Sequence, residues 1–135
     1  MAGFTFRYRL SGGAPTIQSF VAQDTETLTK GDLLSLQGGK LDLAATSDGD
    51  LCGVCLDTGA RTTNVTMVTA ITDADAVYAV TDNNARVAGA LLDIAGATGA
   101  MGVAADSNHD VLVVAASGAT EETLVTFNVA KHWLT

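Results

Sequence analysis

Residues 31–45, with the sequence GDLLSLQGGKLDLAA, decide the fold class of this chain. Two short leucine-rich runs flank Gly38 and Gly39. A pair of glycines readily supplies the positive φ angles that a two-residue β-turn requires. The stretch therefore predicts an antiparallel hairpin that turns at these two glycines.

The chain on either side of this hairpin is also strand-like. In residues 4–10, FTFRYRL, apolar and polar side chains alternate, as they do when a strand shows different faces to core and solvent. Further runs rich in β-branched or apolar residues occupy 16–22, 51–57, 64–71, 76–80, 111–117 and 123–130. The glycines scattered through 90–106 favour bends over a helix, and only 86–93 could form a helical turn or two. About ten short strands predict one all-β domain, a barrel or a sandwich.

Composition limits the classes of partner. The 135-residue chain has 15 acidic and 7 basic residues and a formal net charge of −8, which excludes a basic face for binding nucleic acid. Charged residues are only 16% of the total, and a surface this poor in charge suggests that a partner covers part of it. Residues 1–23 contain Arg7 and Arg9 and no acid, so this segment is expected to have a role of its own.

Targeting signals and membrane spans are not expected. The opening residues MAGFTFRYRL lack the uninterrupted apolar core of a signal peptide. No apolar run reaches the roughly 18 residues of a membrane-spanning helix. We therefore expect a chain that is made in a cytoplasm and that binds neither a membrane nor a nucleic acid.

Cys52 and Cys55 form a C-x-x-C pair, which can indicate a redox or zinc site. A structural zinc site needs four ligands, and the histidines, His109 and His132, are isolated and far along the chain. A redox pair would need a helix beginning at the first cysteine, and the residues after Cys55 do not predict one. Cys52 and Cys55 are an odd number of positions apart, and on a strand this spacing predicts that their side chains point to opposite faces. Two structural thiols are expected, with no metal and no cofactor.

Residues 56–60, LDTGA, resemble the active-site loop of retroviral aspartic proteases, in which two carboxylates share a proton. A chain of this length would supply the second Asp57 by forming a homodimer. The later Gly-Arg-Asn/Asp element of that family and its glycine-rich flap are absent from the sequence. A strand that ends at Asp57 and turns at Thr58-Gly59 explains the same letters. We predict no catalytic residue and keep the protease as an alternative.

A calcium site is a third possibility, because Asp73, Asp75 and Asp82 are close in sequence. They lack the spacing and the closing bidentate glutamate of a calcium-binding loop. A solvated acidic turn is therefore expected.

Much of the chain resembles the small capsid decoration, or cement, proteins of tailed bacteriophages. The resemblance covers about residues 17–130 and is a pattern of glycines and strands. It is carried by Gly31-Asp32-Leu33-Leu34, Gly39-Lys40-Leu41, Gly53-Val54-Cys55-Leu56, Leu92-Asp93-Ile94-Ala95-Gly96 with Gly99 and Gly102-Val103, and Val125-Thr126-Phe127-Asn128. It implies a compact β-barrel or β-tulip that binds the outer surface of a phage head as a trimer and clamps neighbouring major capsid subunits.

This resemblance and the residues together define the expected organisation. Residues 1–16 are expected to form an extended N-terminal arm and residues 17–135 the barrel. Because an unpaired edge strand invites pairing, the arm is expected to dock on a neighbouring subunit or the shell. The predicted interface residues are Phe4, Phe6, Arg7, Tyr8, Arg9, Phe20 and Trp133. Another small β-barrel virion part, such as a head-fibre base or a tail accessory protein, is an alternative.

Overall fold

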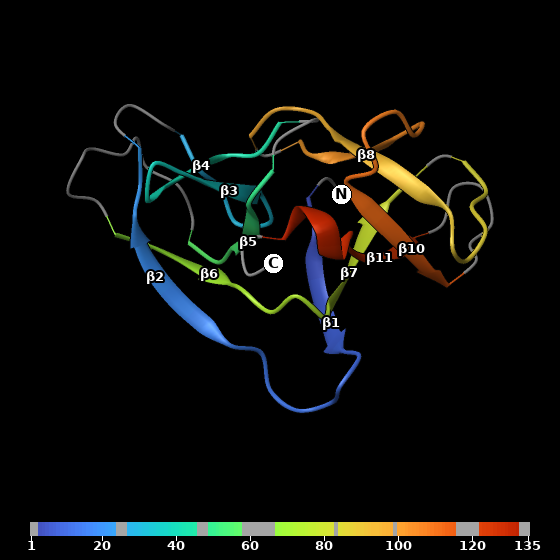
Figure 1. Cartoon of the computed structure of the whole chain (residues 1–135), viewed down its shortest axis with the longest axis horizontal. Coiled ribbons are helices and arrows are strands. Elements are labelled where there is room, and N and C mark those ends of the chain that lie inside the picture. Colours follow the sequence, from blue (N-terminus) through green and yellow to red (C-terminus); the bar gives the residue numbers. More distant parts are fainter. Residues whose placement is uncertain are drawn as a thin grey trace.

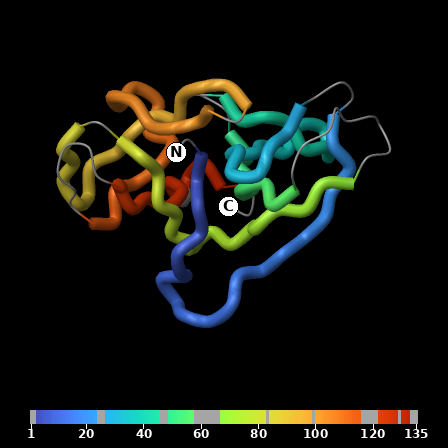
Figure 2. Tube along the Cα trace, turned by 180° about the vertical axis from the view of Figure 1, so that it is seen from behind, coloured from blue at the N-terminus to red at the C-terminus, as the bar shows by residue number. Residues whose placement is uncertain are grey.

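The computed structural model describes residues 3–23, 27–45, 49–57, 67–82, 84–98, 100–115 and 122–132. These residues form two antiparallel sheets that lie side by side (Figures 1 and 2). The six-stranded sheet has the order β1 (Thr5–Arg9), β7 (Ala76–Thr81), β11 (Glu122–Phe127), β10 (Val111–Ala115), β8 (Leu91–Ala95) and β9 (Gly102–Ala104). The five-stranded sheet has the order β2 (Ile17–Val21), β6 (Met67–Ile71), β5 (Leu51–Cys55), β3 (Leu33–Gln37) and β4 (Lys40–Leu43).

The all-β prediction is confirmed, but the predicted barrel is wrong because neither sheet closes. The five-stranded sheet curls far enough for Ala22 to form an isolated bridge with Leu41 on β4. The N–H of Gln23 donates to the Leu41 carbonyl at 2.8 Å. The described part of β4 forms no ladder with β2, so β2 remains an edge strand along 17–21.

The buried apolar side chains form two clusters, which stabilise the sheets. The first core lies between the sheets and draws on both of them, with Leu51 and Val54 from β5, Tyr78 from β7 and Phe127 from β11. The second core is built from the five-stranded sheet and the segments next to it. It consists of Ala22, Leu28, Leu34, Leu41, Cys52, Cys55, Val68 and Ala70. Strand β5 serves both cores and is buried over its whole length.

A bulge in β5 corrects the prediction that the two cysteines face opposite sides. Leu34 pairs with Gly53 and Ser35 with Leu51, so Cys52 is an extra residue between them. An extra residue shifts the alternation of the strand. Cys52 and Cys55 consequently lie in the same second core. Gly53 also lets β5 approach β6, since a Cβ there would stand 1.9 Å from the carbonyl oxygen of Ile71.

The hairpin of residues 31–45 is confirmed. Strands β3 and β4 pair antiparallel, and Gln37 faces Lys40 across Gly38 and Gly39, whose φ angles are +58° and +80°. The helical turn considered for 86–93 is wrong, because β8 begins at Leu91. Within the described ranges the helix found is the short 3₁₀ turn η1 (Val129–Lys131). No helix in those ranges is long and apolar enough to cross a membrane.

The N-terminal strand belongs to the sheet of its own chain. β1 pairs with β7, and Phe4 just before it is only 2% exposed. The N–H of Gly3 donates to Met101 and that of Phe4 to Gly31, both at 2.8 Å. Burial of Phe4 anchors this segment, so in the monomer it is an edge strand and not a free arm.

Candidate interaction site

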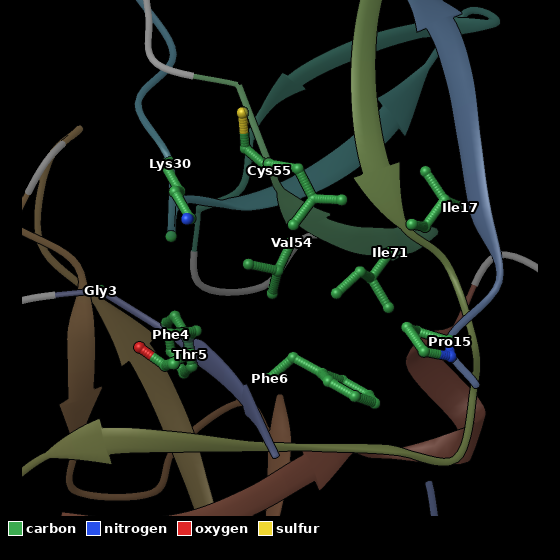
Figure 3. Close-up of a pocket in the computed structure, with 12 residues that line it drawn as sticks. Gly3, Phe4, Thr5, Phe6, Pro15, Ile17, Lys30, Val54, Cys55 and Ile71 are labelled. Carbon is green, nitrogen blue, oxygen red and sulfur yellow. The ribbon is translucent and has the colours of Figure 1, made fainter. Parts of the chain in front are cut away.

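A groove of about 660 Å³ opens between the N-terminal strand and the five-stranded sheet (Figure 3). Phe6 of β1, Val54 of β5 and Ile71 of β6 surround it, with Pro15 and Ile17 on one side. Lys30 lies at the other end of the groove and is exposed. The complete lining is Gly3, Phe4, Thr5, Phe6, Pro15, Ile17, Lys30, Gly31, Val54, Cys55, Leu56 and Ile71. The hollow is thus largely apolar, with one cationic side chain.

A chain of aromatic rings holds Phe6 in place. Its ring meets Tyr78 edge to face, with centroids 6.2 Å apart, and Tyr78 meets Phe127 in the same way at 5.9 Å. Tyr78 is buried, and its hydroxyl donates to the Ile71 carbonyl at 3.5 Å. Burial raises the pKa of this phenol far above its usual value. Because these contacts fix the ring, Phe6 offers apolar surface to a ligand at little cost in side-chain entropy.

The turn between β6 and β7 holds the connection between β1 and β2, which swings away from the sheets in Figures 1 and 2. At one end Arg9 Nε donates to Asp75 at 2.9 Å, and the backbone N–H of Ser11 donates to the same carboxylate at 3.0 Å. At the other end the N–H of Thr16 donates to Asp73 at 2.6 Å. These contacts fix the chain on either side of Pro15.

The electrostatics of this turn follow from the same contacts. The hydroxyl of Ser11, followed by Arg9, lowers the pKa of Asp75 to about 2. The hydrogen bond to Asp75 raises the pKa of Arg9. Arg9 also approaches Asp73 at 3.5 Å. The prediction of a solvated acidic turn is wrong, because Asp73 and Asp82 are buried. Asp73 and Asp75 instead clamp the β1–β2 connection.

The structure brings together only part of the predicted interface. Phe6 lines the groove, Phe4 is a core residue at its edge, and Tyr8 is 42% exposed. Arg7 forms an exposed ion pair with Glu122 at 2.7 Å, and Arg9 is engaged by the turn described above. The docking-arm prediction required both arginines to be free to meet another subunit, and neither of them is free. Phe20 packs against the second core, away from the groove, and Trp133 lies outside the described residues.

Sequence reasoning missed most of the groove wall. Pro15, Ile17, Lys30, Val54 and Ile71 are far apart in the chain and meet only through the sheet topology. One local signal was available, since a proline followed by an apolar strand is typical of an edge strand.

The described residues of the catalytic and metal motifs make contacts within the chain, whereas the turn predicted at Thr58-Gly59 lies outside the described residues. Burial raises the pKa of the Cys52 thiol to about 12 and that of Cys55 to about 11, so both are poor nucleophiles near neutral pH. The Asp57 carboxylate accepts a hydrogen bond from the Thr69 N–H at 2.7 Å. Asp82 binds Arg86 at 2.6 Å. The described residues contain no cluster of three or more metal-binding side chains.

Comparison with known proteins gives a match of fold. No family model and no curated protein sequence matches the chain. Among solved structures, the chain is similar to the N base of the head fiber protein gp8.5 of bacteriophage phi29, with a TM-score of 0.52 and 17% sequence identity. The match covers 86% of this chain and 98% of the phage domain. The two chains thus share an arrangement of strands at low sequence identity.

Proposed function

We propose that this chain is a non-enzymatic structural component of a tailed-phage virion, attached to the outer surface of the head. One observation carries the proposal: nearly the whole phi29 head-fiber base superimposes on this chain. The glycine and strand pattern shared with capsid decoration proteins supports the same placement from the sequence. The low charge content agrees with it, because an attached protein covers part of its surface.

The groove is the proposed attachment site. A rigid aromatic ring in an apolar hollow is the kind of feature that dominates binding energy in protein interfaces. Phe6 meets this description, and Val54 and Ile71 extend the apolar surface around it. Lys30 at the other end favours a segment with an acidic residue beside its apolar side chains. We therefore propose that an extended segment of the major capsid protein occupies the groove.

Attachment of this kind would stabilise the head by mass action. A protein that binds only the assembled, expanded shell adds about 3 kcal/mol per site at a hundredfold excess over Kd. Many copies that clamp neighbouring capsid subunits, as homotrimers, would add this energy over the whole particle. The net charge of −8 would keep decorated heads apart in solution.

A head-fiber base is the second candidate, and the name of the matching structure favours it. A decoration protein and a fiber base differ in what they carry. A decoration protein ends at its own outer face, whereas a base holds a further fiber segment. The position of the chain in electron micrographs of labelled particles would distinguish them.

Co-sedimentation with purified heads of the source phage tests attachment. The wild-type chain should pellet with the heads. Phe6→Ala should bind at least tenfold more weakly, because it removes the aromatic ring from the groove wall. Lys30→Glu keeps the aromatic cluster intact and should weaken binding through charge alone. Val87→Ala is the matched control, since Val87 is 69% exposed and lies outside the groove. A wild-type chain that stays in the supernatant would overturn the proposal.

The same preparation tests the protease alternative. Asp57→Asn should leave head binding unchanged, because Asp57 is not part of the groove. Peptide cleavage at mildly acidic pH by the wild-type chain, abolished by Asp57→Asn, would instead favour the protease.

A further inference from the structure

Strand β2 is an open edge. Among the described strands it pairs only with β6, over five consecutive residue pairs from Ile17–Ile71 to Val21–Met67. Strand β4 comes close to the end of β2, but the bridge between the two segments is at Ala22, beyond the last residue of β2. Figure 1 shows β2 at the outer margin of the five-stranded sheet. Among the described residues, no strand is hydrogen-bonded to the open side of β2 along Ile17–Val21, and Ile17, Gln18 and Ser19 are exposed.

The hydrogen bonds next to β2 show which of its backbone groups point outward. The N–H of Thr72 donates to the carbonyl of Thr16 at 3.1 Å, so this pair is hydrogen-bonded. Bonded and non-bonded pairs alternate along an antiparallel ladder, which places Ile17 and Ser19 at non-bonded positions. Thr69, opposite Ser19, agrees with this phase, because its carbonyl accepts from Leu56 on the other side of β6 at 2.9 Å. Ile17 and Ser19 thus direct their N–H and C=O groups away from β6.

Nothing in the sequence of β2 blocks further pairing. Its residues IQSFV include no charge and no proline, and its register with β6 is regular. The side chain of Ile17 is 56% exposed, as is that of Met67 at the far end of the ladder. Soluble proteins usually protect such an edge with charges, bulges or short length. An unprotected edge is therefore a candidate for pairing with another chain.

The absence of charge at this edge favours a second copy of this chain as the occupant. With a net charge of −8, two copies repel each other over most of their surfaces. Neither β2 nor the neighbouring strand β6 carries a charged residue, so edge-to-edge contact at β2 places no like charges opposite each other. Each edge offers both donors and acceptors at Ile17 and Ser19, as a self-complementary two-fold interface requires.

We infer that β2 pairs with β2 of a second copy, antiparallel and centred on Gln18. In this register Ile17 exchanges N–H···O=C hydrogen bonds with the partner's Ser19, and Ser19 with the partner's Ile17. The two five-stranded sheets then form one continuous sheet across the dimer. This contact borders the groove, whose lining includes Ile17, but it uses the backbone of β2 and does not rest on the proposed function.

A proline substitution tests the pairing directly. Ser19→Pro removes an N–H that points away from β6, so the ladder within the chain keeps its hydrogen bonds. Ser19→Ala is the matched control, because it removes only the hydroxyl. Sedimentation velocity over a concentration series should give a wild-type mass that is an even multiple of 13.7 kDa, twice this mass if monomers pair and six times this mass if the proposed homotrimers pair through β2. Ser19→Pro should halve that mass, and Ser19→Ala should leave it unchanged.

A second variant guards against misfolding of the proline chain, which circular dichroism would reveal. Ile17→Lys brings positive charges close together across the two-fold axis at an exposed position and should weaken the dimer at least tenfold. A monomer at every concentration would overturn the inference, as would an odd multiple of the chain mass. An even multiple that is unchanged in a folded Ser19→Pro and in Ile17→Lys would also overturn it.

Discussion

The strands β1 and β2 border the same groove, yet they are held in different ways. β1 is anchored by Phe4 in the first core and interrupted by a bulge at Arg7, where the register with β7 shifts. β2 has a regular register, and three of its five residues are exposed. An edge that is bulged and charged resists pairing, whereas a regular and uncharged edge permits it. The two sides of one groove are therefore suited to different contacts, which the following predictions test.

The largest difference is expected in stability. Phe4→Ala should lower the free energy of unfolding by about 3–5 kcal/mol, because it leaves a cavity beneath β1. Ile17→Ala, on the exposed strand, should change it by only about 0.5 kcal/mol. Urea denaturation of both variants measures the contrast. Equal losses would show that β2 is as firmly packed as β1.

The connection between the two strands should depend on Asp73. Asp73→Ala leaves the N–H of Thr16 without its acceptor and removes one carboxylate from Arg9, at a cost of about 2 kcal/mol. Amide hydrogen exchange should become faster in residues 11–17, whereas exchange within β1 should change less. Asp73→Asn keeps an oxygen acceptor and is the control. Unchanged exchange in the connection would contradict the clamp.

Acid should lower the stability of the fold through His132, which contacts the segment paired with β2. This side chain is buried, and its Nε2 lies 3.1 Å from the carbonyl of Thr72, the residue whose N–H binds Thr16. Burial lowers the pKa of His132, so the folded state favours the neutral ring. The unfolded chain binds the proton more readily. The contribution of the neutral His132 to stability is therefore fully present above a pH of about 6.5 and falls as the pH drops below it.

Urea midpoints at pH 7.5 and 5.5 measure this effect. His132→Gln keeps a hydrogen-bond donor for Thr72 and should show a smaller difference between the two pH values. Asp75, with a pKa near 2, keeps its charge throughout this range. A difference of the same size in His132→Gln would assign the acid sensitivity to another group.

The parts of the fold that were predictable depend on local chemistry. Gly38 and Gly39 fix the β3–β4 hairpin because only their own φ angles are required. The bulges at Arg7 and Cys52 could not be predicted, since each arises from the register of a partner strand distant in the sequence. Alternation therefore placed the two cysteines on opposite faces, and a single extra residue reversed that result.

The candidate site was predictable only in part for the same reason. The alternation of residues 4–10 predicted a strand with Phe6 and Tyr8 on one face, and the bulge at Arg7 interrupts that alternation. It could not show that Phe4 would be buried by its own chain, because that depends on Gly31 and Met101, far along the sequence. Nor could it show that acidic side chains of the β6–β7 turn would engage Arg9. Ion pairs and cavities of this kind are set by tertiary contacts.

A small effect on stability, and the closest test of the two edges, is expected from deletion of Arg7. Arg7 is the extra residue of the bulge, and its ion pair with Glu122 is exposed. Its removal should cost less than about 1 kcal/mol, because exposed ion pairs contribute little. Phe6 and Tyr8 would then follow each other in a regular ladder with β7.

The deletion should thus make the β1 edge regular and less charged, and self-association should rise. Sedimentation velocity should show a further concentration-dependent assembly that Ser19→Pro does not remove. Arg7→Ala, which keeps the bulge while removing the charge, is the control that separates geometry from electrostatics. If both variants associate equally, charge alone protects β1. If only the deletion associates, the bulge is what makes β1 a closed edge while β2 stays open.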